Sequence, residues 1–302
     1  MTEKLAVLDL GTNTFHLLIL EFQEDGQFIE HFRERRFIKL AENGIQKIGP
    51  APFQRAVASM QDFAKILKEQ DVSRTFAFGT AALRTASNGA QLADTILEKT
   101  GIEVAIIDGD REASLIHQGV KLAVPFDQKN RLIMDIGGGS VEFIIANRDQ
   151  VQWAESFPIG VAILYNAFHQ SEPISTRAQS DLIRHISEKL SPLRTALLKF
   201  PCDDLVGASG TFDVIENLLA DGKAGPHHAF VAASKLDILK NKVLPATLDE
   251  RRNMPGVPLD RSDMIVVAVL LIEYIIQIAD IKRIIVSEFA LKEGVLAELR
   301  KT

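Results

Sequence analysis

The sequence RLIMDIGGGSVEFIIA at residues 131–146 decides which fold to expect. It predicts a buried strand that ends at Asp135, a tight turn of three glycines and a serine, and a second strand that Glu142 opens. Consecutive glycines let backbone N–H groups turn inward, and inward amides form a concave anion site. Phosphate beside two carboxylates would be repelled unless a divalent cation lay between them. We therefore interpret the turn as a phosphate site in which both carboxylates serve a hard metal ion, with a plain glycine hairpin as the alternative.

A second copy of this motif lies near the N-terminus. The sequence LAVLDLGTNTFHLLIL at residues 5–20 aligns without a gap with the stretch quoted above. Asp9 takes the place of Asp135, whereas His16 falls opposite Glu142, so the copies are not chemically equal. Such a repeat predicts two lobes built on one plan, each contributing a turn to a shared cleft. Two facing turns suit a polyphosphate group better than a single phosphate.

Length and composition favour a soluble protein of two domains. The 302 residues are enough for two full cores, and the single Cys202 excludes an internal disulfide framework. The longest apolar stretch, 264–279, is interrupted by Glu273 and is shorter than the roughly 20 residues that span a bilayer. The chain passes from Met1 almost directly into the first expected strand, without a visible targeting signal. We expect a cytoplasmic protein that binds no membrane.

The charge balance bears on the partners. A net charge of -6 argues against nucleic-acid binding and requires any polyanion site to be a local basic patch. Arg33, Arg35 and Arg36 near the end of the third expected strand are interpreted as a solvated edge, with a role in the cleft as the alternative. The seven histidines show no metal-ligand spacing, and His227 and His228 are expected on a surface loop.

Apolar periodicity and turn residues predict the same order of elements in both halves. The first lobe is expected at 1–124 and the second at 125–302, with the last helix able to pack back on the first lobe. Residues 24–26 are expected to form a turn, 80–88 a polar loop, and 245–258 an irregular segment. Strands are expected at 5–10, 15–22, 27–38, 74–79, 103–107, 131–135, 141–146, 151–157, 204–209 and 283–287. Helices are expected from 50–52 to 70, at 89–100 and 110–122, within 160–200, after 211, and near 233–243, 261–279 and 290–300.

Three further segments could carry chemistry. Glu112 lies in the first turn of a predicted helix, where the helix dipole favours its ionised form, and a carboxylate there could orient or deprotonate a water. An ordinary acid at a helix start is the alternative. The turn at 209–211 opens a helix after an apolar strand, which is typical of an anion site but equally of simple capping. Lys292 could bind phosphate or lie on the surface.

Six motifs together resemble the exopolyphosphatase / guanosine pentaphosphate phosphohydrolase (Ppx/GppA) family. They are DLGTNT at 9–14, TAALRTASN at 80–88, REASLIHQGV at 111–120, MDIGGGSVEF at 134–143, GASGT at 207–211 and LKEGVL at 291–296. The resemblance implies an α/β fold of two ribonuclease-H-like lobes with a cleft between them, as in the actin-like superfamily. It also implies release of orthophosphate from a chain end with Mg²⁺, or with Mn²⁺ in its place.

The resemblance also implies roles for individual residues. Glu112 corresponds to the catalytic base, and Asp135 and Glu142 to carboxylates that serve the cation and the water, with Asp9 as a further metal ligand. The segment KLAENG at 39–44 departs from the basic, glycine-rich segment that the family has there. The implied phosphate-binding residues are Gly11, Thr12, Asn13, Thr14, Arg84, Gly137, Gly138, Gly139, Ser140, Ser209, Gly210, Thr211 and Lys292.

The mechanism expected from these residues is metal-assisted transfer of a phosphoryl group to water. Inorganic polyphosphate is the first substrate, and guanosine pentaphosphate would suit the same cleft. A non-catalytic nucleotide or polyphosphate sensor is disfavoured because Glu112, Asp135 and Glu142 are all present. A kinase or ATPase would need an adenosine pocket that the sequence does not reveal. A homodimer that joins two clefts is a possible assembly.

Overall fold

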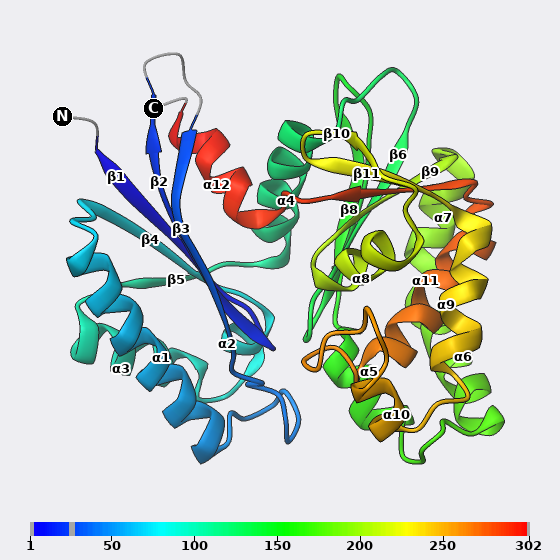
Figure 1. The fold of residues 1–302 in the computed structure, drawn as a ribbon, viewed down its shortest axis with the longest axis horizontal. Coiled ribbons are helices and arrows are strands. Elements are labelled where there is room, and N and C mark those ends of the chain that lie inside the picture. Colours follow the sequence, from blue (N-terminus) through cyan, green and yellow to red (C-terminus); the bar gives the residue numbers. More distant parts are fainter. Residues whose placement is uncertain (1–2, 24–27, 301–302) are drawn as a thin grey trace.

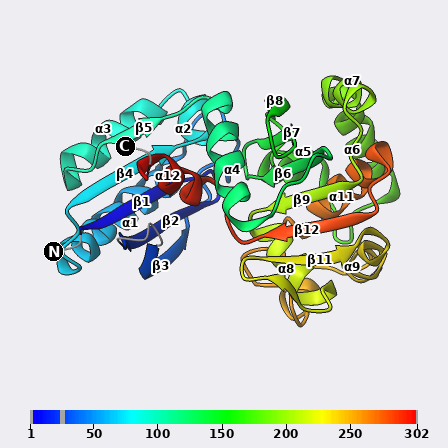
Figure 2. The same cartoon turned by 90° about the horizontal axis from the view of Figure 1, so that it is seen from above.

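The computed structural model describes residues 3–23 and 28–300, and it consists of two lobes, each a mixed sheet with helices packed on it (Figure 1; Figure 2). The turn expected at Glu24–Gly26 lies outside the described residues. Among the described residues, no helix combines the length and the apolar character that a membrane span requires.

The first lobe is a five-stranded sheet of order β3-β2-β1-β4-β5. Strands β1 to β3 form an antiparallel meander, and β4 and β5 extend it in parallel on the other side of β1. The strands are β1 Lys4–Leu10, β2 Thr14–Phe22, β3 Phe28–Phe37, β4 Arg74–Gly79 and β5 Val104–Ile106. The helices are α1 Pro50–Glu69, α2 Ala81–Thr85, α3 Gly89–Thr100 and α4 Gly109–Ala123.

The second lobe repeats this plan and extends it. Its seven-stranded sheet has the order β10-β11-β12-β9-β6-β7-β8, in which β8-β7-β6-β9-β12 corresponds to β3-β2-β1-β4-β5. The strands are β6 Arg131–Ile136, β7 Val141–Ala146, β8 Val151–Phe157, β9 Asp204–Ala208, β10 Lys223–Gly225, β11 His228–Ala232 and β12 Arg283–Ser287. The helices are α5 Val161–Phe168, α6 Thr176–Lys189, α7 Ser191–Lys199, α8 Gly210–Leu219, α9 Leu236–Val243 with a preceding 3₁₀ turn at Ala233–Lys235, α10 Leu248–Arg252, α11 Ile265–Ala279 and α12 Leu291–Leu299. The predicted fold class, α/β with two ribonuclease-H-like lobes, is confirmed.

Alternation along β1 explains how the first sheet is covered on both faces. Ala6, Leu8 and Leu10 belong to the core under α1 and α3. Val7 belongs instead to a core formed with α4 and α12. Successive side chains of a strand point to opposite faces, so a wholly apolar strand of this kind must be buried on both sides.

Helices α4 and α12 cross in backbone contact between the lobes (Figure 1). A Cβ on Gly119 of α4 would lie 1.8 Å from the carbonyl oxygen of Ala290, and a Cβ on Gly294 of α12 would lie 1.8 Å from that of Leu115. Only glycine permits this approach. The crossing positions two predicted site residues, Glu112 at the start of α4 and Lys292 at the start of α12.

Three local predictions were wrong. Arg84 lies on the short helix α2, not in a loop, because five residues are too few to reveal a helical period. Residues 245–258 include α10, which begins with a capping box at Thr247. His228 is buried in β11, where its Nδ1 bonds the carbonyl of Ala123, and the whole β10–β11 hairpin was missed because its strands are short and interrupted by Gly and Pro.

Candidate active site

Two glycine turns meet at a cavity between the lobes, about 260 Å³ in volume. The turns close in the same way: the amide of Gly11 donates to the carbonyl of Thr14 at 3.1 Å, and that of Gly137 donates to Ser140 at 3.0 Å. A Cβ on Gly138 would lie 2.6 Å from the asparagine side chain of the other turn, so no side chain fits there. The repeat in the sequence is therefore also a repeat of local structure.

The strands on either side of each turn fix the neighbouring side chains. In the first lobe Asp9 is the cross-strand partner of His16, and in the second Asp135 is the partner of Glu142. Directly opposite residues of antiparallel strands share a face of the sheet. The two carboxylates predicted to flank the turn are thus immediate neighbours, and all four side chains line the cavity.

Glu112 enters the cavity from the first turn of α4. The helix begins there because the N-cap Asp108 accepts a hydrogen bond from the amide of Arg111 at 2.8 Å. The carboxylate of Glu112 accepts from Arg84 Nη1 at 3.0 Å, and the same nitrogen donates to the carbonyl of Ile107 at 2.7 Å. Arg84 therefore orients Glu112 and is not itself among the residues that line the cavity.

Glu142 is held by two hydroxyl groups. Ser140 Oγ donates to its Oε1 at 2.6 Å and Ser156 Oγ donates to the same atom at 2.7 Å. These hydrogen bonds favour the ionised form and oppose the effect of burial on its pKa, which is nevertheless raised. Both hydroxyl groups direct one carboxylate oxygen, so the orientation of Glu142 is fixed before any ligand binds.

Burial raises the pKa of the four carboxyl groups that cluster beside the turns and the start of α4, which are Asp9, Glu112, Asp135 and Glu142. For Asp135, burial and then the charges of Glu142 and Asp9 raise the pKa to about 7. For Glu112, burial and then the charge of Glu142 raise the pKa well above its ordinary value, although Arg84 opposes the shift. Each ionised carboxylate disfavours the next, so a bound cation would favour ionisation of the whole cluster.

Cationic side chains from both lobes line the same cavity. They are Arg33 and Arg35 of β3, Arg261 from the loop before α11, and Lys292 of α12. Burial and then the charges of Lys292, Arg261, Arg35 and Arg33 lower the pKa of His16 well below its ordinary value, which keeps this imidazole neutral at pH 7. The local basic patch that a polyanion site requires is therefore present in an acidic chain.

The arginines of β3 correct one prediction. Strand β3 does form the edge of the sheet, but Arg33 and Arg35 line the cavity and are not simply solvated. Arg35 is the cross-strand partner of His16, which faces the cavity, whereas Arg36 points to the other face and pairs with Asp62. The two-residue period of the strand was the signal that could have found them.

The predicted turn after β9 contributes two of its three residues. Ser209, at a left-handed φ of 79°, exchanges hydrogen bonds with the backbone of Ile136 at 3.0 and 3.2 Å, which ties α8 to the end of β6. Gly210 lies against Arg261, because a Cβ there would be 2.0 Å from its Nη2. Thr211 is buried and faces a separate small cavity.

Most of the predicted site residues meet in the one cavity. Those that line it are Asp9, Gly11, Thr12, Asn13, Thr14, Glu112, Asp135, Gly137, Gly138, Gly139, Ser140, Glu142, Ser209, Gly210 and Lys292. Arg84 and Thr211 do not line it. The prediction missed His16, Thr80 and Asp213 as lining residues. It gave Arg33 and Arg35 a role in the cleft only as the alternative, and it named Arg261 only as a further candidate cation near the cleft.

The donor set fits a magnesium ion that also binds phosphate. Among residues 3–23 and 28–300, no three His, Cys, Asp or Glu side chains are arranged to hold a metal by themselves. Mg²⁺ typically keeps several waters and takes one or two carboxylates plus substrate phosphate oxygens. Buried carboxyl groups whose pKa values are raised by one another, beside a patch of cations, supply that kind of site.

Comparison with known proteins finds relatives that belong to one family of phosphatases. Residues 22–302 match the model of the Ppx/GppA phosphatase family. Exopolyphosphatase 1 of Mycobacterium tuberculosis is 28% identical, with 99% of this chain and 88% of that protein aligned. Guanosine-5'-triphosphate,3'-diphosphate pyrophosphatase of Vibrio parahaemolyticus is 27% identical, with 97% of this chain but only 59% of that protein aligned.

Solved structures show the same fold. The crystal structure of an exopolyphosphatase from Cytophaga hutchinsonii superimposes with a TM-score of 0.93 at 35% identity, over 99% of this chain and 98% of the other. A Ppx/GppA family member from Aquifex aeolicus reaches a TM-score of 0.81 at 20% identity, over 99% and 98% of the two chains.

Proposed function

Because this chain belongs to the Ppx/GppA phosphatase family, we propose that it is an exopolyphosphatase that releases the terminal phosphate of inorganic polyphosphate by attack of water. The observation that carries the proposal is one cavity in which the carboxyl groups of Asp9, Glu112, Asp135 and Glu142 lie beside cations contributed by both lobes. Such a site can neutralise a phosphate chain and activate a water beside it. Catalysis of phosphoryl transfer consists mostly of these two effects.

The phosphate chain binds at the turns. Backbone amides of residues 138–140 and 12–14 surround the terminal phosphates, while those of Gly11 and Gly137 close the turns. The N-terminus of α8 adds its positive dipole end. Lys292 and Arg261 balance the charge of the phosphate that becomes the leaving group. Mg²⁺, or Mn²⁺, when held by Asp135, Glu142 and Asp9, would neutralise charge on the phosphate oxygens.

Glu112 acts as the general base. It accepts the proton of a water aligned with the terminal phosphorus, while Arg84 holds its carboxylate. A new bond forms between water oxygen and phosphorus as the terminal anhydride bond breaks, giving orthophosphate and a chain one phosphate shorter. Burial raises the pKa of Glu112, which makes it a stronger base than an exposed carboxylate.

The test compares substrates directly. Purified protein is assayed for orthophosphate release from polyphosphate, guanosine pentaphosphate and ATP, each with EDTA and with Mg²⁺. We expect the highest turnover with polyphosphate. We expect this turnover in the presence of Mg²⁺ and none in EDTA. Release from none of the three substrates would contradict the proposal, and so would release from ATP alone.

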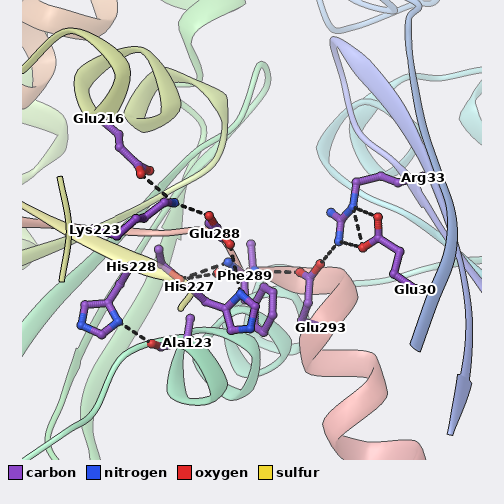
Figure 3. A network of polar contacts seen from close by, with 12 residues as sticks. Glu30, Arg33, Ala123, Glu216, Lys223, His227, His228, Glu288, Phe289 and Glu293 are labelled. Atoms are coloured by element: carbon purple, nitrogen blue, oxygen red, sulfur yellow. Dashed lines mark hydrogen bonds and ion pairs between the residues drawn. The ribbon is translucent and has the colours of Figure 1, made fainter. Parts of the chain in front are cut away.

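Guanosine pentaphosphate is the second candidate substrate, and one observation favours it. A second cavity of about 760 Å³ shares Arg33, Asp213 and Glu288 with the first. Its wall includes Phe289, which stacks on His227 with ring centroids 4.3 Å apart (Figure 3). A nucleoside could lie there while its phosphates reach the glycine turns.

A variant separates the two substrates. Phe289→Ala removes one of the aromatic side chains of the second cavity, which Phe22, Phe28 and His227 also line, without touching the glycine turns. If the nucleotide is a substrate, its KM should rise by roughly tenfold, since stacking on a base contributes about 1–3 kcal/mol. The KM for polyphosphate should stay the same. Equal changes for both substrates would argue against a nucleoside in this cavity.

We also propose the domain boundary and the location. A boundary at residues 124/125, with lobes at 1–124 and 125–302, is supported by the division of the strands into two sheets. Helix α12 nevertheless belongs to the core that covers the first sheet. A cytoplasmic location is supported by the free Cys202, which suits a reducing compartment.

A further inference from the structure

Arg251 is a buried arginine outside the cavity. It lies on α10 and its side chain is fully buried. Its guanidinium donates from Nε to the carbonyl of Ser262 at 2.8 Å, from Nη1 to the carbonyl of Ala246 at 2.5 Å, and from Nη2 to Glu172 at 2.9 Å. A buried charge is costly unless it is fully paired, so this arrangement needs a reason.

Two of these acceptors lie at the two ends of one excursion of the chain. Ala246 precedes α10, and Ser262 follows the irregular segment that leads back to α11. By bonding both carbonyls, Arg251 closes the excursion on itself. The backbone around residue 262 is therefore held from inside the lobe.

The residue immediately before Ser262 is Arg261, which lines the cavity. Its guanidinium packs on Gly210, where a Cβ would lie 2.0 Å from Nη2. Its Nε finds no hydrogen-bond partner among the described residues and lies 3.4 Å from Asp260 Oδ2. Because Nε of Arg261 has no hydrogen-bond partner in the described part of the chain, the position of the guanidinium depends on the position of the backbone at residue 261.

We propose that Arg251 is a positioning residue that fixes Arg261 over the N-terminus of α8 for binding of a substrate phosphate. The inference rests on the proposed function, in which Arg261 contacts the phosphate chain. Arg251 itself touches no substrate. Its loss should weaken binding of the substrate and leave the chemistry of the bound complex nearly unchanged.

The central variant is Arg251→Lys, which keeps the charge but offers a single point donor in place of the planar fork. We expect the KM for tripolyphosphate to rise by about tenfold, less than the roughly 10²-fold loss of activity that a distant mutation can cause by misplacing a group by about 1 Å. The kcat should stay within about twofold. Arg252→Lys, on the same helix and paired at the surface with Asp249, is the matched control and should leave KM unchanged.

A double-mutant cycle tests whether Arg251 changes KM through Arg261. If Arg251 acts through Arg261, then Arg261→Gln alone should raise KM, and adding Arg251→Lys should raise it no further. A merely structural role would lower Tm and would add its effect in both backgrounds. Additive effects on KM, or an unchanged KM in Arg251→Lys, would overturn the proposal.

A milder variant keeps the test decisive if Arg251→Lys does not fold. Glu172→Gln loosens one of the three partners and leaves both carbonyl contacts, so KM should rise by a smaller factor in the same direction. An unchanged KM in a folded Glu172→Gln protein whose Arg251→Lys counterpart is unfolded would also overturn the proposal.

Failure of the proposed function would be visible separately. If the wild-type protein released no orthophosphate, the cycle would be measured as calorimetric binding of tripolyphosphate in the presence of Mg²⁺. Loss of affinity in Arg251→Lys that disappears in the Arg261→Gln background would still support the positioning role. Equal affinity in the wild type and Arg251→Lys would contradict it.

Discussion

At the scale of single residues, Glu112 is the group on which activation of water depends. We predict that Glu112→Gln lowers kcat by about 10²–10⁴-fold, the usual contribution of a general base, while tripolyphosphate still binds. Asp110→Asn changes an exposed acid in the same first helical turn and serves as the control. A Glu112→Gln enzyme with near-normal turnover would remove this residue from the mechanism.

Asp135 links the site to stability. Its pKa of about 7 lies above the ordinary value of 3.8, so the folded metal-free protein binds a proton that the unfolded chain has lost. The contribution of protonated Asp135 to the free energy of unfolding is fully present below pH 3.8. It is lost as the pH rises through 7, where Asp135 ionises in the folded protein as well. At 1.36 kcal/mol per pKa unit, this amounts to roughly 4 kcal/mol for an isolated group.

The expected result is a pH-dependent difference between two proteins. In EDTA, the Tm of Asp135→Asn relative to the wild type should rise between pH 5 and pH 8, because the amide never ionises. The measurement is thermal unfolding at several pH values. A difference that stays constant with pH would show that Asp135 does not titrate in this range.

A site residue could be predicted from the sequence when the residues that position it are close to it in the sequence. Asp135 and Glu142 were predictable because a short turn between paired strands fixes their spacing. Arg33 and Arg35 could be placed only by knowing which face of β3 meets the cavity. Arg261 depends on Gly210, and nothing in the local sequence records that contact.

At the scale of elements, the crossing of α4 and α12 holds residues of both lobes in one site. We predict that Gly119→Ala destabilises the protein by about 1–3 kcal/mol, the usual cost of overpacking, because backbone atoms of the partner helix occupy the Cβ position. Ser114→Ala, exposed on the same helix, should change stability by less than about 0.5 kcal/mol. Chemical denaturation measures both, and equal stabilities would contradict the packing argument.

The elements that the sequence predicted well are long and periodic. Helix α1 buries Ala56, Met60, Phe63 and Leu67 at helical spacing, and its limits were predicted within a few residues. Helices α2 and α10 have five residues each and show no such period. The hairpin β10–β11 is stabilised by pairing with β12, which is distant in sequence, so no local pattern specifies it.

At the scale of the whole molecule, the charges around the site bear on the length of the substrate. The neighbouring cavity carries Glu30, Asp213 and Glu288 beside its cations Arg33 and Arg300, so it offers a polyanion little attraction. A chain of phosphates should gain affinity from its first few units only. We therefore predict distributive cleavage and a preference for short polyphosphates.

A gel of partly digested long polyphosphate tests this prediction. A smoothly shortening ladder is the expected result, since the enzyme would release the chain after each one or few cleavages. Full-length chains that coexist with free phosphate, without intermediates, would show processive action. A homodimer that joins two clefts into one groove is the assembly that would produce that outcome.

The central claim is that water attacks the terminal phosphorus in the cavity between the lobes. Its most direct test is digestion of polyphosphate in water enriched in oxygen-18, with Mg²⁺, by the wild type and by Glu112→Gln. We predict that the wild type places one oxygen-18 atom in each released orthophosphate and that Glu112→Gln forms this product at least about 10²-fold more slowly. Incorporation of oxygen-18 into the shortened chain would contradict the account. Equal rates of orthophosphate release by the wild type and Glu112→Gln would contradict it too.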